Sequence, residues 1–228
     1  MLTIVQARMS SRRLPGKVIR PLGGVPMLGA LIDRLTRTRS ISAIVVATSD
    51  GPDDDAIADF CAKTRAACFR GPLDDVAARL ADAAQRAGAM AFVRVSGDSP
   101  FMDPDLVDAV VDLFERQDVD LATNVQARTF PKGQSVEVVR LDALRRAQAM
   151  MAPGEAEHVT PVFYRRPHDF RIANLASGHD WGAIQMSVDT PQDWALAERM
   201  MAAMRREPGR WDVARLVALR ERCLAEAA

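Results

Sequence analysis

The sequence is short of cysteine, of net charge and of long apolar runs. Its three cysteines among 228 residues are odd in number and lack paired spacing, which excludes a disulfide framework and predicts buried free thiols in a reducing compartment. Thirty Lys and Arg residues balance thirty Asp and Glu residues, so no overall charge indicates a nucleic-acid partner. No apolar run approaches the ~20 residues that cross a bilayer, which excludes a membrane-spanning class.

Two common phosphate-binding motifs are also missing. A Walker A motif needs a glycine where Ser11 stands, and no G-x-G-x-x-G follows the first apolar run, which disfavours a P-loop NTPase and a simple dinucleotide dehydrogenase. The first residues lack the apolar core of a signal peptide, so we expect a cytoplasmic protein. No Pro/Ser linker, low-complexity tract or fixed repeat divides the chain, and we expect one domain over 1–228.

Apolar runs of strand length alternate with longer amphipathic stretches, in a composition that is 48% hydrophobic and 26% charged. The expected strands are Leu2–Ala7, Ala43–Thr48, Ala66–Phe69, Ala91–Val95, Val119–Thr123, Ser135–Arg140 and Ala183–Val188. The expected helices are Met27–Arg37, Asp54–Thr64, Asp75–Ala87, Pro104–Arg116, Pro191–Met204 and Asp212–Ala225. This pattern predicts an α/β fold with a mostly parallel, twisted sheet and helices on both faces. The irregular, proline-rich segment at about 124–180 is expected to be an elaboration on that sheet.

A cationic loop follows the first expected strand. It holds Arg8, Arg12, Arg13 and Lys17 together with serines and one glycine, a set of donors that can surround phosphate. The alternative is an ordinary solvated basic loop. Because ligands of doubly wound sheets bind at the carboxyl ends of strands, the position of the loop favours phosphate binding. Loop side chains such as Arg8 and Lys17 are expected outside the core.

Two aspartates follow expected strands. Asp98 lies in Gly-Asp after one strand and Asp189 after another, where carboxylates near a phosphate site suit Mg²⁺. The alternatives are a turn role for Asp98, and a start of the next helix with Thr190 as N-cap and Pro191 at its first position. We expect both carboxylates to converge on one ion. Without metal or a neighbouring cation, their repulsion should make one easier to protonate than a free Asp, an effect that Lys17 partly offsets.

Two polar patches in the irregular segment are candidates for a substrate-facing wall. The first contains Lys132, Gln134 and Glu137, and the second contains Glu157 and His158. The polar density of these patches favours substrate binding, although an isolated histidine is more often structural. We therefore expect 124–180 to form the substrate side of the site and part of a subunit contact.

Five motifs in order carry a resemblance: ARMSSRRLPGK, GDSP, FPKGQSVEV, EHVTP and SVDTPQDW. Together they resemble the spore-coat polysaccharide protein F branch of the CMP-sugar cytidylyltransferase family, whose relatives include the CMP-Kdo and CMP-acylneuraminate synthetases. The resemblance implies a Rossmann-like nucleotidyltransferase fold and transfer of CMP from CTP to a sugar, with a sugar acid favoured, for surface polysaccharide synthesis. It implies Mg²⁺ as cofactor, CTP and the sugar as partners, and a homodimer, with no nucleic acid and no membrane.

The resemblance also implies roles by position. The catalytic set would be Arg8, Lys17, Asp98 and Asp189, with the two aspartates as metal ligands. The nucleotide-binding residues would be Ala7, Arg8, Ser11, Arg12, Lys17, Arg79 and Ser96, with Arg79 near the base. Val5-Gln6 stands where the Kdo enzymes have Ile-Pro, and Ser96 stands where they have glutamine, so their sugar specificity does not transfer.

Two other functions stay open at the level of sequence. A nucleotide-sugar glycosyltransferase would use an acidic motif such as Asp53-Asp54-Asp55 to hold its metal, although acidic residues also favour a helix start. A noncatalytic nucleotide-binding subunit would keep the fold without the reaction, and the presence of both Asp98 and Asp189 argues against it.

Overall fold

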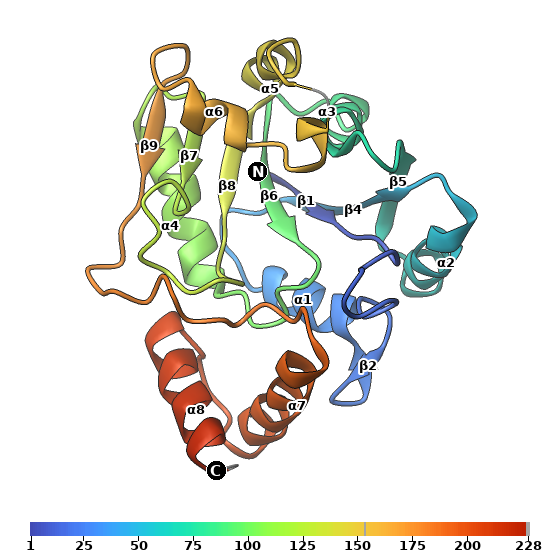
Figure 1. Ribbon diagram of the computed structural model, residues 1–228, viewed down its shortest axis with the longest axis vertical. Coiled ribbons are helices and arrows are strands. Elements are labelled where there is room, and N and C mark those ends of the chain that lie inside the picture. The colour runs from blue at the N-terminus through green and yellow to red at the C-terminus, as the bar shows by residue number, and fades with distance from the viewer. Residues whose placement is uncertain (153, 227–228) are drawn as a thin grey trace.

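A seven-stranded sheet forms the centre of the protein in the computed structural model, which describes residues 1–152 and 154–226 (Figure 1). The strand order is β5-β4-β1-β6-β8-β7-β9. The strands are β1 Leu2–Gln6, β4 Ala43–Ser49, β5 Ala67–Gly71, β6 Ala91–Ser96, β7 Leu121–Thr123, β8 Glu137–Arg140 and β9 Ile172–Asn174. A small antiparallel hairpin, β2 Pro21–Leu22 and β3 Val25–Pro26, lies apart from this sheet.

The sheet is mostly parallel, as the sequence predicts. β1 pairs in parallel with β4 and β6, β4 with β5, and β7 with β9, whereas β8 runs antiparallel to both of its neighbours. The carboxyl ends of β1, β4, β5, β6, β7 and β9 therefore meet at one edge. In parallel α/β sheets this edge holds the ligand.

Helices cover both faces of the sheet, which confirms the expected layers. The helical segments are α1 Met27–Leu35, η1 Pro52–Asp54, α2 Asp55–Thr64, α3 Val76–Arg86, α4 Pro104–Arg116, α5 Leu141–Gln148, η2 Glu155–Glu157, α6 Pro161–Arg165, α7 Pro191–Arg206 and α8 Val213–Ala225. α3, α5 and α6 pack over residues such as Ile4 and Phe92 on one face. α1, α2, α4, α7 and α8 pack with Val5 and Val95 on the other, where α7 and α8 lie side by side at the bottom of Figure 1.

Capping residues at the N-termini of the helices are found where the sequence predicts them. Thr190 and Asp193 form a capping box at α7, with Pro191 in the first turn, so the cap interpretation of Thr190 is confirmed. Asp75 and Asp212 cap α3 and α8 by accepting hydrogen bonds from backbone N–H groups.

No helix among the described residues is long and apolar enough to cross a membrane. Of the three free cysteines, Cys61 and Cys223 are buried, but Cys68 is exposed on the outermost strand, contrary to expectation.

The expected strand Ala183–Val188 is wrong. Only an isolated bridge between Lys132 and Gln185 forms there: Met186 and Val188 are buried, but no neighbouring strand pairs with the segment. Its backbone is satisfied by single bonds, including Lys132 N–H to Ile184 O at 2.9 Å and Val188 N–H to Asp98 O at 2.9 Å. The segment 124–180, in contrast, is more regular than expected, because it supplies β8, β9, α5 and α6.

Gly133 makes the bridge possible. Its φ is +91°, and a Cβ there would lie 2.4 Å from Ser187 N and 2.6 Å from Met186 C. The two segments can approach this closely only with glycine at 133. The approach places the chain that leads into Asp189.

We expect Gly133→Ala to lower the free energy of unfolding by at least about 2 kcal/mol more than Gly178→Ala, measured by urea denaturation. Gly178 is a matched control because its φ is +75° with no atom within 4 Å of an added Cβ. Both variants acquire the backbone strain, but only Gly133→Ala pushes against Ser187. Equal losses would contradict the close approach.

Candidate active site

The loop after β1 is closed and anchored by its own backbone. Gly16 N–H donates to Met9 O at 2.9 Å, and Met9 N–H donates to the Asp54 carboxylate at 2.6 Å. Asp54 is 1% exposed and also accepts from Ser49 N–H, so it joins the loop to the end of β4. Burial raises the pKa of Asp54, but hydrogen bonds from Ser49 and Met9 outweigh this and the net pKa is lowered. The loop is therefore held in shape at its base.

The end of β6 lies tightly against the end of β1. Gly97 N–H donates to Gln6 O at 2.8 Å, and a Cβ at Gly97 would lie 3.0 Å from that oxygen and 3.2 Å from Ala7 Cβ. Glycine permits this approach, and Asp98 follows at the strand edge beside the loop.

Lys17 joins the two predicted carboxylates. Its Nζ donates to Asp98 Oδ2 at 3.2 Å, to Asp189 Oδ1 at 2.8 Å and to Val188 O at 2.7 Å. The structure thus brings Asp98 and Asp189 together, although Asp189 does not follow a strand. The expectation that Lys17 lies outside the core is wrong, because its side chain is only 7% exposed.

The expected rise in carboxylate pKa applies only without a neighbouring cation, and Asp189 has Lys17 and Arg13 beside it. Burial raises the pKa of Asp189, but the hydrogen bond and charge of Lys17, with help from Arg13, outweigh it and the net pKa lies below the ordinary value. Arg13 lies 3.3 Å from Asp189 Oδ1. The two carboxylates therefore share the Lys17 ammonium group as a common cation.

A cavity of about 410 Å³ opens over these groups, within the range of about 300–1,000 Å³ typical of small-molecule sites. The cationic residues that line it are Arg8, Arg12, Arg13, Lys17, Arg79 and Arg94. Its acidic residues are Asp98, Glu157 and Asp189. Cations thus outnumber carboxylates, and the cavity suits a polyanion such as a nucleotide.

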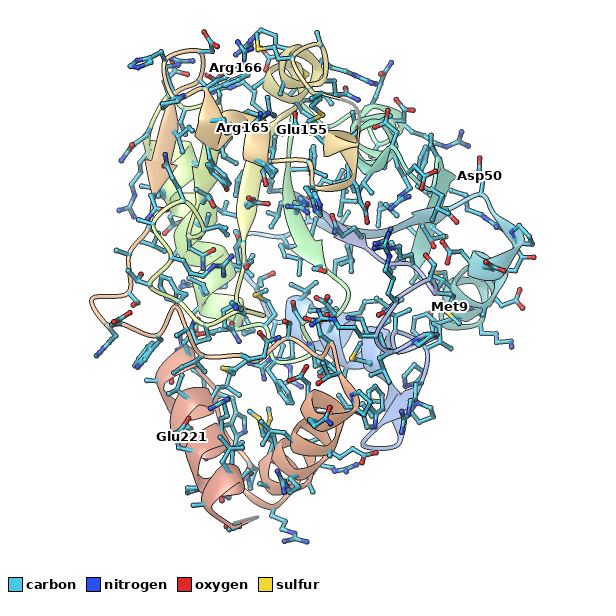
Figure 2. All side chains as sticks on the ribbon, viewed as in Figure 1. Met9, Asp50, Glu155, Arg165, Arg166 and Glu221 are labelled. Atoms are coloured by element: carbon cyan, nitrogen blue, oxygen red, sulfur yellow. The ribbon has the colours of Figure 1, made fainter. Side chains whose placement is uncertain are left out.

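The turn that contains Glu157 closes one side of the cavity. Arg8 donates to Glu157 at 2.6 Å, and this ion pair lowers the pKa of Glu157. Arg165 of α6 forms an ion pair with Glu155 of η2 at 2.7 Å (Figure 2). Helix α6 therefore fixes the turn that carries Glu157 and His158.

Arg79 lies at the β5 end of the cavity. Its Nη1 donates to Pro72 O at 2.5 Å and to Leu73 O at 3.2 Å, and its stem packs on Gly71. Arg79 is 2% exposed, and its Nε has no hydrogen-bond partner within the described chain. Burial lowers the pKa of Arg79. The two hydrogen bonds to Pro72 O and Leu73 O therefore fix the guanidinium in the cavity wall.

Most of the predicted site residues meet in this cavity. Those that line it are Ala7, Arg8, Ser11, Arg12, Lys17, Arg79, Ser96, Asp98, Glu157, His158 and Asp189. Lys132, Gln134 and Glu137 do not line it. Gln134 is fully buried, and its amide bonds to Phe101 O at 2.6 Å and Asp103 N–H at 2.9 Å, so it holds the backbone instead. Glu137 is 3% exposed and pairs with Arg94.

Sequence reasoning missed Gln6 and Arg94 as residues of the cavity wall. Arg94 was the clearest available signal, because it is a charged residue in the otherwise apolar strand Ala91–Ser96. The acidic triplet behaves as a helix start: Asp53 and Asp54 lie in η1 and Asp55 begins α2. None of the three lines the cavity.

The fold and the sequence agree with those of known proteins. The spore coat polysaccharide biosynthesis protein SpsF of Bacillus subtilis is 32% identical over 200 residues, which cover 85% of this chain and 83% of that protein. A 3-deoxy-manno-octulosonate cytidylyltransferase of Geobacter sulfurreducens is 30% identical over 177 residues, covering 77% and 69%. A solved cytidylyltransferase of Leptospira borgpetersenii superposes with a TM-score of 0.91 at 27% identity, covering 98% and 95%.

A mostly parallel sheet with a cationic loop and two carboxylates at its carboxyl edge, together with these relatives, defines a nucleotidyltransferase of Rossmann-like fold. The family model described as Cytidylyltransferase matches residues 2–205. The chain belongs to the cytidylyltransferase family.

The lowered pKa of Asp189 predicts an acid-sensitive stability. The folded pKa lies below the unfolded value of about 3.9, so the ionised carboxylate stabilises the fold above that value and the contribution is lost as pH falls through the folded pKa. We expect Asp189→Asn to flatten the pH dependence of the unfolding free energy below about pH 4, measured by urea denaturation from pH 2 to 6. An unchanged acid limb would contradict the ion pair with Lys17.

Proposed function

We propose that the protein transfers CMP from CTP to a hydroxyl of a sugar and releases pyrophosphate. The observation that carries the proposal is the cationic cavity in which Lys17, Asp98 and Asp189 meet beside the loop after β1. Family membership supports CTP as the nucleotide. A role in surface polysaccharide synthesis is supported by the similarity to the spore coat protein.

The phosphates would lie over the loop. Arg8 and Arg12 line the cavity with exposed or half-exposed guanidinium groups, which can bind phosphate oxygens in a bidentate manner. Ser11 adds a hydroxyl donor. Arg79, which lines the cavity at the β5 end, would lie near the base. This arrangement puts the reacting α-phosphate near Lys17.

The residues present fit Mg²⁺. Asp98 and Asp189 supply hard oxygen donors, and the ammonium group of Lys17 already lies between them as a cation. Mg²⁺ takes one or two carboxylates and completes its shell with water and phosphate oxygens. These two residues would therefore hold it. When bound, the ion supplies charge neutralisation for the phosphate oxygens.

The chain's own groups then act by position and charge. Lys17, Arg8 and Arg12 would bind the negative charge that develops on the leaving pyrophosphate, while the cavity orients the sugar hydroxyl for in-line attack on the α-phosphorus. Protein nucleophiles are not part of this mechanism.

The two alternative functions make different predictions. A glycosyltransferase would need Asp53–Asp55 at the cavity, and these residues lie outside it. A noncatalytic subunit would bind CTP without releasing pyrophosphate.

The homodimer and the cytoplasmic location stay predictions from the sequence.

Incubation with CTP, Mg²⁺ and a panel of sugars and sugar acids should release pyrophosphate in an enzyme-coupled assay, only when an acceptor is present.

Arg8→Ala should weaken CTP binding by roughly tenfold or more, because a charge-assisted contact to phosphate is lost. The loss should be larger at low salt. Arg37→Ala is the control, since Arg37 is an exposed residue just after α1 and pairs with Asp33. CTP binding without pyrophosphate release for every acceptor would favour the noncatalytic alternative, and unchanged CTP affinity in Arg8→Ala would contradict the loop assignment.

The metal pair gives a separate prediction. Asp98→Asn and Asp189→Asn should each abolish most of the gain in CTP affinity that Mg²⁺ confers, measured by calorimetry with and without the ion. The double variant should be scarcely worse than either single one, because all three lose the same ion. Independent, additive losses in free energy would instead indicate that the two carboxylates have separate roles.

A further inference from the structure

A row of polar side chains crosses the sheet next to the cavity. Register places Arg94 of β6 opposite Glu137 of β8, and Glu137 opposite Thr123 of β7. These residues share the face covered by α3, α5 and α6, since Phe92 and Val139 on the same strands belong to that core. Gln6 of β1 lies on the same face, opposite Ser96 and two residues beyond the partner of Arg94 toward the carboxyl edge.

The row is held by hydrogen bonds. Arg94 Nη1 donates to Glu137, and Tyr164 of α6 donates its hydroxyl to the same carboxylate at 2.5 Å. Arg94 Nε donates to Gln6 Oε1 at 2.8 Å. A guanidinium has only donors, so the amide oxygen of Gln6 must face it and the Gln6 Nε2 group is directed away from it.

The end of the row that borders the cavity presents only hydrogen-bond donors to it. Gln6 and Arg94 both line the cavity, and the side chain of Arg94 is 16% exposed. Within the described residues, neither Arg94 Nη2 nor Gln6 Nε2 makes a hydrogen bond. The matching ligand group has acceptors alone, as an ionised carboxylate does, whereas a hydroxyl also needs an acceptor for its own proton.

The place of this pair favours the acceptor over the nucleotide. Arg79 occupies the cavity wall on the β5 side of β1, while Arg94 lies on β6, on the opposite side of β1. The cationic loop follows β1 between them, and Asp98 follows the strand that carries Arg94. A nucleotide that reaches from Arg79 to the loop leaves the β6 side free.

We propose that Gln6 and Arg94 are specificity-determining residues that bind a carboxylate of the acceptor sugar. The inference rests on the proposed cytidylyl transfer and adds the residues that select the acceptor. The ion pair with Glu137 orients Arg94 without a ligand, and the excess of cations in the cavity favours an anionic group.

The experiment uses matched ligands on the whole protein. Calorimetry measures the affinity of the nonreactive analogue α,β-methylene-CTP with Mg²⁺, and then, at saturation, the affinities of 3-deoxy-manno-octulosonate, N-acetylneuraminate and their methyl esters. The wild type should bind at least one acid roughly tenfold or more tighter than its ester. Gln6→Leu and Arg94→Lys should lose most of that preference and keep the analogue affinity within about threefold.

Neither substitution leaves the buried Glu137 carboxylate without a cation, so both variants are expected to fold. Arg94→Lys keeps a cation beside buried Glu137, and Gln6→Leu leaves the Arg94–Glu137 pair intact. Arg145→Lys is the control, an exposed α5 residue bonded to Asp82, and should behave as wild type.

Each other outcome has one meaning. Equal binding of acid and ester by the wild type, binding of neither acid while the analogue binds, or an unchanged preference in both variants would overturn the inference. A loss of analogue affinity in Gln6→Leu and Arg94→Lys would assign the pair to the base and overturn it as well. Absence of analogue binding by the wild type would overturn the proposed function itself.

Discussion

The ammonium group of Lys17 is the contact on which the site depends. It joins the loop after β1, the end of β6 and the irregular chain before α7 by donating to Asp98, Asp189 and Val188 O. Two carboxylates this close repel unless a cation lies between them. Removing one partner of a buried ion pair typically costs about 3–5 kcal/mol, so the group that assembles the site also stabilises the fold. Arg8, half-exposed, reports on ligand binding without this complication.

The period of the apolar residues was enough to predict the layers. Strand-length runs alternating with amphipathic helices lead to a parallel sheet with two covered faces, and these are present. The run Ala183–Val188 misled because burial and strand pairing are different requirements. Met186 and Val188 enter the core. The backbone of the segment bonds to separate groups, such as Lys132, Asp98 and the Lys17 ammonium group, and not to a strand. The pairing of β7 with β9 depends on residues about 50 positions apart, which no local pattern encodes.

The candidate site likewise contains residues that the sequence could identify and residues whose roles it could not give. Asp98 and the loop residues could be found because each follows a strand, and strand ends of a parallel sheet share an edge. The roles of Gln134 and Glu137 could not, since one amide holds two backbone groups and one carboxylate faces Arg94 across the β6–β8 register. The pattern around Arg94 marked a charge in a buried strand, yet only the register gives that charge its partner. Residue type identified candidates, and pairing decided their roles.

The cations of the cavity fall into two groups by exposure. Lys17, Arg79 and Arg94 are buried or nearly so, and each is fixed by hydrogen bonds to the chain, so they are oriented before a ligand arrives. Arg8, Arg12 and Arg13 are partly or largely exposed, and Arg8 is held by a carboxylate that an incoming phosphate could replace. An exposed ion pair contributes about 0–1 kcal/mol, so exchanging Glu157 for phosphate costs little. Fixed donors can thus select the ligand, while the exposed cations adjust to its charge.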